Sequence, residues 1–88
     1  LRGDHPQVGW EEVARASPAP LLLDVRTPLE YVNGHIPGAV NIPVDELRGR
    51  LAEVPAGRDI VAYCQVGQRG YIATRILMQS GRRVRNLG

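Results

Sequence analysis

The sequence predicts an α/β sandwich in which helices cover both faces of a mainly parallel β-sheet. Short apolar segments bounded by proline, glycine and polar residues alternate along the chain with segments of helical periodicity. Strands that alternate with helices pair in parallel through right-handed crossovers. The chain has 88 residues, which allows one domain with one core. Residues 1–8 lack periodicity and are expected to form a linker or an artificial extension, so the domain is expected to occupy residues 9–88.

The first half of the domain is expected to contain two helices and two strands. Residues 10–16 have a short helical pattern that serine and proline bring to an end. Residues 21–25 are apolar and few, as expected of a buried strand. The Thr-Pro-Leu-Glu sequence at residues 27–30 is a capping box with proline at the first helical position, so a helix begins there. Residues 39–42 form the next strand.

The second half repeats this alternation. Asp45 is expected to cap a helix that ends at residue 51 or 52. The apolar residues 60–64 are expected to form one strand, and residues 84–87 are expected to form the last strand. Residues 71–80 have helical periodicity, and Gly81 is expected to be the C-terminal cap of that helix. The residues of this helix that we expect to be buried are Ile72, Ile76 and Leu77.

Composition and charge exclude several classes of function. Hydrophobic residues make up 43% of the chain and charged residues 23%, which predicts a globular domain, and no apolar segment is long enough to span a membrane. The formal charge is +2, and the arginines are scattered without interleaved aromatic residues, which argues against nucleic-acid binding. Cys64 is the single cysteine, so a disulfide framework is excluded and a reducing, cytoplasmic location is expected.

Cys64 lies where ligands bind in parallel sheets, at the carboxyl end of a predicted strand. The backbone amides of the loop after Cys64, and the amino terminus of the helix after that loop, favour the binding of an anion. Gly67 allows positive φ, and Arg69 adds a cation able to bind an oxyanion through two hydrogen bonds. We therefore predict that Cys64 is a nucleophile held as a thiolate, although a buried structural cysteine is the alternative. The residues expected to line this anion loop are Gln65, Val66, Gly67, Gln68 and Arg69.

Three ordered motifs resemble the rhodanese sulfurtransferase family. They are Leu-Leu-Asp-Val-Arg at residues 22–26 with Glu30, Gly-His-Ile-Pro-Gly-Ala at residues 34–39, and the Cys64 to Arg69 loop. The resemblance implies a three-layer α/β/α sandwich with a mainly parallel sheet of about five strands. It also implies that Cys64 is the catalytic residue, which accepts a sulfane sulfur as a persulfide and passes it to a thiol or another nucleophile.

The donor implied by the resemblance is thiosulfate, coenzyme A persulfide or another low-molecular-weight persulfide, with no metal or organic cofactor in this domain. Cys64 and Arg69 enclose four residues, as in sulfurtransferases, whereas the related phosphatases and arsenate reductases typically enclose five. A phosphatase or arsenate reductase is therefore a weaker alternative. A non-catalytic interaction module is another, although modules of this kind often lack the cysteine.

Within that family, residues 1–8, 64–71 and 86–88 look closest to the rhodanese domain fused behind flavin-dependent coenzyme A disulfide or persulfide reductases. This closer resemblance implies a fused flavoprotein domain that binds FAD and NAD(P)H. It also implies that the domain is truncated at its C-terminal end, because relatives continue into a further glycine and a closing helix.

Other polar residues are expected to support the site rather than to react. Asp24 and Arg26 are expected to form a local ion pair that positions the neighbouring loops. His35 lies in a turn and is expected to bond to backbone or carboxylate groups. The capping box accounts for Glu30 without a catalytic role.

Overall fold

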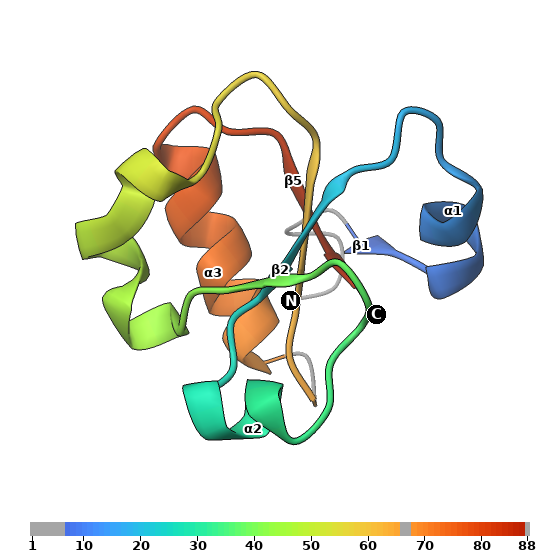
Figure 1. Ribbon diagram of the computed structural model, residues 1–88. Coiled ribbons are helices and arrows are strands. Elements are labelled where there is room, and N and C mark those ends of the chain that lie inside the picture. The colour runs from blue at the N-terminus through green and yellow to red at the C-terminus, as the bar shows by residue number, and fades with distance from the viewer. Residues whose placement is uncertain (1–6, 66–67, 88) are drawn as a thin grey trace.

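The fold is built on a five-stranded parallel sheet with the strand order β1-β5-β4-β2-β3. We describe a computed structural model over residues 7–65 and 68–87 (Figure 1). This parallel α/β architecture confirms the fold class expected from the sequence. The strands are β1 (Gln7–Val8), β2 (Leu21–Asp24), β3 (Val40–Asn41), β4 (Ile60–Tyr63) and β5 (Val84–Leu87).

Strand β4 lies at the centre of the sheet, and all four of its residues are buried. It pairs with β2 over its whole length, from Leu21 beside Ile60 to Asp24 beside Tyr63, and with β5 on its other side. A strand buried on both faces has a continuous apolar sequence, as Ile-Val-Ala-Tyr has here. The residue after Tyr63 therefore lies at the middle of the carboxyl edge of the sheet.

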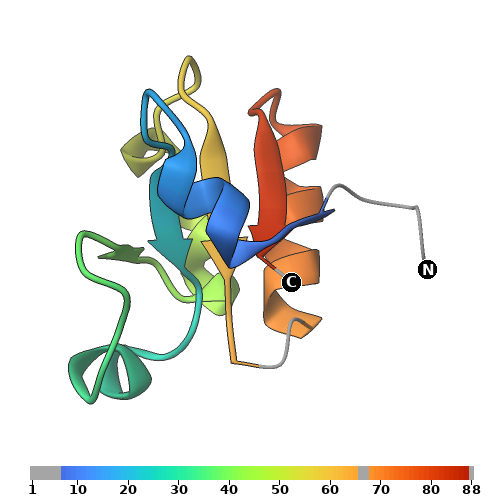
Figure 2. The ribbon, with the colours of Figure 1, turned by 90° about the vertical axis from the view of Figure 1, so that its right-hand side faces the viewer.

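Helices lie on both faces of the sheet (Figures 1 and 2). The helix α3 (Gln68–Gln79) and the 3-10 helix η1 (Val44–Glu53) cover one face. The helix α1 (Trp10–Arg15) covers the other face, where Val13 packs with Val8 and Val61. The larger cluster, beneath α3 and η1, contains Leu23, Val25, Ile42, Leu47, Val54, Ile60, Ala62, Ala73, Ile76, Leu77 and Val84.

The short helix α2 (Pro28–Val32) lies at the carboxyl end of the sheet, near the start of α3 (Figure 1). The predicted capping box is confirmed. The Thr27 side chain accepts a hydrogen bond from the Glu30 amide at 3.3 Å, and the Glu30 carboxylate accepts one from the Thr27 amide at 2.9 Å. None of the α2 residues is buried, so the cap contributes substantially to fixing this helix.

Several expectations about local structure are wrong. Gln7 and Val8 form β1, which pairs with β5, so the expected linker over residues 1–8 does not extend through them; residues 1–6 lie outside the described chain. Asp45 does not cap the segment that follows, because Pro43 occupies the N-cap of η1 and makes no side-chain cap bond. Ile72 is 45% exposed, because Ala73, Ile76 and Leu77 form the face of α3 that packs on the sheet.

Helix α3 ends at a glycine cap, as expected. Gly81 has φ +86°, and its amide bonds to the Met78 carbonyl at 3.0 Å while the Arg82 amide bonds to the Leu77 carbonyl at 3.0 Å. This pair of bonds is the Schellman motif, which satisfies carbonyls at the helix end.

Replacing Gly81 with alanine is expected to lower the free energy of unfolding by about 1 kcal/mol, because a Cβ is strained in the left-handed region. Urea denaturation of the two proteins measures the difference. Gly57→Ala is the matched control, since Gly57 has no positive φ and a Cβ there would meet no atom within 4 Å. Equal midpoints for Gly81→Ala and the wild type would contradict the role assigned to this cap.

Candidate active site

Cys64 directly follows the central strand β4 and is half-buried at the carboxyl edge of the sheet. The Gly70 amide, in the first turn of α3, donates a hydrogen bond to Cys64 Sγ at 3.2 Å. The amino-terminal end of a helix carries a partial positive charge and exposes unpaired amides. The sulfur therefore lies where a negative charge is stabilised, and it is not sealed in the interior as a structural cysteine would be.

Gly70 is tightly enclosed by its neighbours. A Cβ at this position would overlap Asn86 Oδ1 and would lie 3.2 Å from Asn86 Cγ and 3.6 Å from the Cys64 amide nitrogen. Asn86, on β5, is 2% exposed, so its side chain has little room to move away. The absence of a side chain at Gly70 thus lets the first turn of α3 approach both β5 and the sulfur.

Asp24 ends β2 and is completely buried. Its carboxylate accepts hydrogen bonds from Arg26 Nη2 at 2.7 Å, from Arg26 Nε at 2.9 Å and from the Arg26 amide at 3.0 Å. Burial alone would raise the pKa of Asp24, but these bonds outweigh it and hold the pKa below its ordinary value. The expected local ion pair is confirmed.

The ion pair also fixes the turn that follows α2. Arg26 Nη2 donates to the Gly34 carbonyl at 2.7 Å, and the Arg26 guanidinium lies 5.7 Å from the centre of the Tyr63 ring. The Tyr63 hydroxyl accepts a hydrogen bond from the Ile36 amide at 3.1 Å. Strand β4 and the 34–38 turn are therefore held together immediately beside Cys64.

These groups border a cavity of about 250 Å³ that reaches the sulfur. A cavity of this size admits a small donor, or the reactive end of a larger one. Its lining residues are Arg26, Gly34, His35, Ile36, Tyr63, Cys64 and Gln65. A larger cavity, of about 480 Å³, is lined by Asp59 and residues 82–85 among others, but none of its described lining residues is a cysteine, serine or other ready nucleophile.

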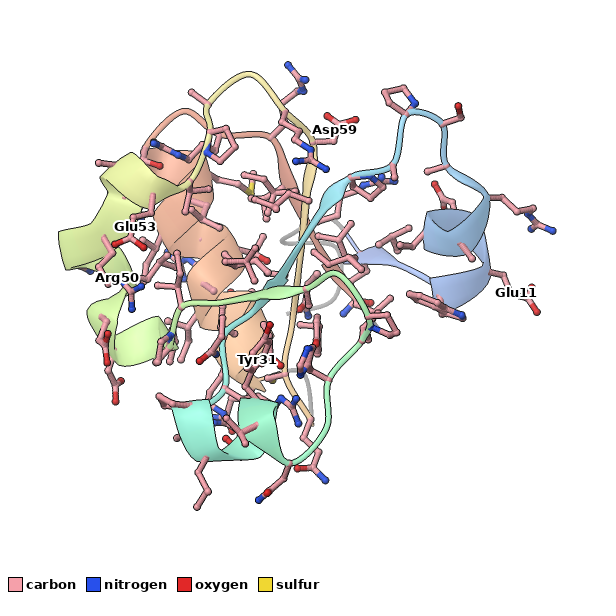
Figure 3. All side chains as sticks on the ribbon, in the orientation of Figure 1. Glu11, Tyr31, Arg50, Glu53 and Asp59 are labelled. Atoms are coloured by element: carbon pink, nitrogen blue, oxygen red, sulfur yellow. The ribbon has the colours of Figure 1, made fainter. Side chains whose placement is uncertain are left out.

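His35 contacts a backbone carbonyl, as expected from the sequence. Its Nδ1 lies 2.7 Å from the Tyr31 carbonyl oxygen, and its ring stacks on the Tyr31 ring with the centroids 3.6 Å apart. The Tyr31 hydroxyl in turn donates to the Ala39 carbonyl at 2.6 Å. Tyr31 points from α2 toward the sheet (Figure 3), so these contacts fasten the 34–38 turn to α2.

Arg69, which is expected to bind an oxyanion, is paired with a carboxylate of α2. Its guanidinium forms two hydrogen bonds with Glu30, at 2.8 Å for Nη1–Oε1 and 3.1 Å for Nη2–Oε2. The bond to Glu30 is the main cause of the raised pKa of Arg69. Glu30 therefore has a second partner besides the capping box. The sequence did not predict this pair, because no local pattern indicates a contact between residues 39 positions apart.

The remaining predicted loop residues are only partly described. Gln65 is exposed and borders the cavity, and Gln68 is exposed in the first turn of α3. Val66 and Gly67 lie outside the described residues. Sequence reasoning missed the close packing of Gly70 against Asn86, although a glycine at the start of a helix and an asparagine between Val84 and Leu87 were available signals.

The described residues contain neither a metal-binding cluster nor a membrane-spanning helix. Over residues 7–65 and 68–87, no group of three or more histidine, cysteine, aspartate or glutamate side chains is arranged to hold a metal ion. Among the same residues, none of the helices has both the length and the apolar character needed to cross a membrane.

The segment that contains this cysteine and the helix after it matches a known protein family. The family described as the rhodanese-like domain matches residues 9–88. The chain belongs to the rhodanese family. This membership confirms the family resemblance seen in the three sequence motifs.

Individual rhodanese relatives occur in different protein contexts. The chain is 52% identical over 68 residues to the HTH-type transcriptional regulator Rv0324 of Mycobacterium tuberculosis, covering 75% of this chain and 30% of that protein. It is 47% identical over 61 residues to a sulfurtransferase of Allochromatium vinosum, covering 69% of this chain and 57% of that protein. The chain thus spans less than two thirds of the length of either relative.

A solved structure with this rhodanese fold is reduced CoADR-RHD from Bacillus anthracis. The TM-score is 0.87 and the identity 48%, and the match covers 94% of this chain and 15% of that one. The resemblance to the rhodanese domain of a CoADR-type protein, expected from the sequence, is therefore confirmed.

Proposed function

We propose that this rhodanese domain is a sulfurtransferase in which Cys64 accepts a sulfane sulfur and passes it to a thiol. The observation that carries the proposal is the hydrogen bond from the Gly70 amide to Cys64 Sγ at 3.2 Å. A helix amino terminus and an inward-pointing amide stabilise a thiolate and, after transfer, an anionic persulfide. The sulfurtransferase among the relatives supports the same class of reaction.

The proposed cycle has two displacement steps. In the first, the Cys64 thiolate attacks the outer sulfur of the donor, a new S–S bond forms, and the donor's own S–S bond breaks. The leaving group, a thiolate or sulfite, departs with the electron pair, and Cys64 becomes a persulfide anion. In the second, an acceptor thiolate attacks the outer sulfur of that persulfide and releases the Cys64 thiolate. Neither step requires an external oxidant or reductant.

The proposed donors are thiosulfate, coenzyme A persulfide or another low-molecular-weight persulfide. The resemblance to CoADR-RHD supports a further proposal, that the domain works beside a fused flavoprotein carrying FAD and NAD(P)H. We propose that this domain itself uses no cofactor, because the cycle needs only a thiolate and donors of hydrogen bonds. A reducing compartment such as the cytoplasm would keep Cys64 as the thiol that the cycle requires.

The direct test is the intact mass of the protein after incubation with thiosulfate or with cysteine persulfide. We expect the mass to rise by one sulfur atom and to return to its starting value after addition of a thiol acceptor. Cys64→Ser is the control and should gain no sulfur. A wild-type protein that gains no sulfur from either donor, or a Cys64→Ser variant that gains as much as the wild type, would refute the proposal.

A further inference from the structure

Both described guanidinium groups beside Cys64 are already paired with carboxylates. Arg26 is bonded to Asp24, and Arg69 is bonded to Glu30 through two hydrogen bonds. Pairing through two hydrogen bonds is the strong arrangement by which arginine binds carboxylates and other oxyanions. A donor anion that used the Arg69 guanidinium in this way would have to displace Glu30.

Glu30 is held in place by its own helix. Its Oε1 accepts hydrogen bonds from the Thr27 amide at 2.9 Å and from the Thr27 hydroxyl at 3.1 Å, besides the bond from Arg69. The Arg69 bond, with the Thr27 amide bond next in size, lowers the pKa of Glu30 to about 2. The carboxylate is therefore negative throughout the neutral pH range, and the capping box keeps it facing Arg69.

The consequence depends on the charge that a donor carries next to its reactive sulfur. Thiosulfate places two negative charges there, so it meets a neutralised Arg69 and the repulsion of Glu30. An ionised organic persulfide carries one negative charge at its reactive end, on the sulfane sulfur, and the sulfur atom bonded to that sulfane sulfur is uncharged. The Glu30 charge therefore raises the free energy of binding a small dianion more than that of binding a persulfide.

We propose that Glu30 is a specificity-determining residue that disfavours small divalent anions and thereby directs the site to organic persulfide donors. This inference rests on the proposed sulfurtransferase function. It assigns a role to the Glu30–Arg69 pair beyond the capping of α2, and it makes donor selection a property of a residue that does not touch the reacting sulfur.

The test is the Glu30→Gln variant, assayed with thiosulfate and with cysteine persulfide as donors. Glutamine retains the Oε1 acceptor and is equally suited to a capping box, so the charge is removed while α2 stays capped. We expect the KM for thiosulfate to fall by about three- to tenfold with kcat unchanged, and the KM for cysteine persulfide to change by less than about twofold. Added salt should make this fall in the KM for thiosulfate smaller, because it screens the charge of an Arg69 side chain that is no longer paired with a carboxylate.

Two further variants control this experiment. Glu53→Gln removes a carboxylate that forms a similar two-bond pair with Arg50, on η1 and away from α2 (Figure 3), and it should leave both KM values unchanged. The double variant Glu30→Gln with Arg69→Gln should not show the lower KM for thiosulfate, because the Arg69 guanidinium is then absent.

The inference would be overturned if Glu30→Gln changed the KM for both donors equally or left the KM for thiosulfate unchanged. It would also be overturned if the KM for thiosulfate were still lowered in the double variant that lacks Arg69. These results differ from a failure of the proposed function. If the function itself is wrong, the wild-type protein gains no sulfur from either donor. If only the inference is wrong, Cys64 is loaded normally and the preference between donors does not depend on Glu30.

Discussion

Replacing Asp24 with alanine is expected to lower the free energy of unfolding by about 3 kcal/mol. Asp24 is fully buried, and its carboxylate binds both the side chain and the amide of Arg26. The Arg26 side chain is only 14% exposed, so the substitution leaves a largely desolvated cation without its counter-charge. For a domain of this size a change of that magnitude lowers the melting temperature by more than about 10 °C, which thermal unfolding followed by circular dichroism measures.

The matched control for Asp24 is Asp59→Ala. Asp59 also bonds to an arginine, Arg83, at 2.7 Å, but the two side chains are 58% and 66% exposed. Asp59 lies at the end of the molecule opposite α2 (Figure 3). An exposed pair of this kind contributes at most about 1 kcal/mol. Similar losses of stability for the two variants would show that burial of the Asp24 pair has no special importance.

The same pair predicts how stability responds to acid. The pKa of Asp24 is lowered in the folded protein from its ordinary value of 3.8, so the unfolded chain binds the proton more readily. The contribution of Asp24 is therefore complete above pH 3.8 and is lost as the pH falls through the lower folded pKa. In Asp24→Asn, denaturant midpoints should fall less steeply than those of the wild type as the pH is lowered through this range.

Replacing Gly70 with alanine is expected to reduce the rate of sulfur loading on Cys64 by about ten- to hundredfold. The added Cβ overlaps Asn86 Oδ1, so the first turn of α3 must move away from β5. That movement also takes the Gly70 amide away from Cys64 Sγ. Alanine favours a helix over glycine by about 1 kcal/mol, so the helix alone would be stabilised. We nevertheless expect a net loss of about 1–3 kcal/mol, because overlap in a packed interior outweighs helix propensity.

Time-resolved intact mass spectrometry and urea denaturation measure the two effects of Gly70→Ala. Gly49→Ala is the control, because a Cβ on Gly49 meets no atom within 4 Å. Shortening the clashing residue as well, in Gly70→Ala combined with Asn86→Ala, should restore part of the loading rate that Gly70→Ala loses. If the single variant Gly70→Ala loaded sulfur at the wild-type rate, the close approach of α3 to the sulfur would be unimportant.

Local interactions explain which parts of the fold the sequence predicted well. The capping box at Thr27, the glycine cap at Gly81 and the continuous apolar run of β4 depend on residues within one or two turns of each other. Strand β1 was missed because two residues carry no periodicity, and Gln7 and Val8 become a strand only by pairing with β5, whose Asn86 and Leu87 are their partners.

The sequence by itself determined the alternation of strands and helices, the position of Cys64 after a buried strand, and the local pairing of Asp24 with Arg26, since each depends on neighbouring residues. Only the tertiary structure decided what surrounds the sulfur. It brought Arg69 to Glu30 and Asn86 to Gly70, pairs joined by packing between elements far apart in the chain. Hydrophobic periodicity specifies which faces become buried, but it does not specify which partner an arginine or a buried amide meets across the interface.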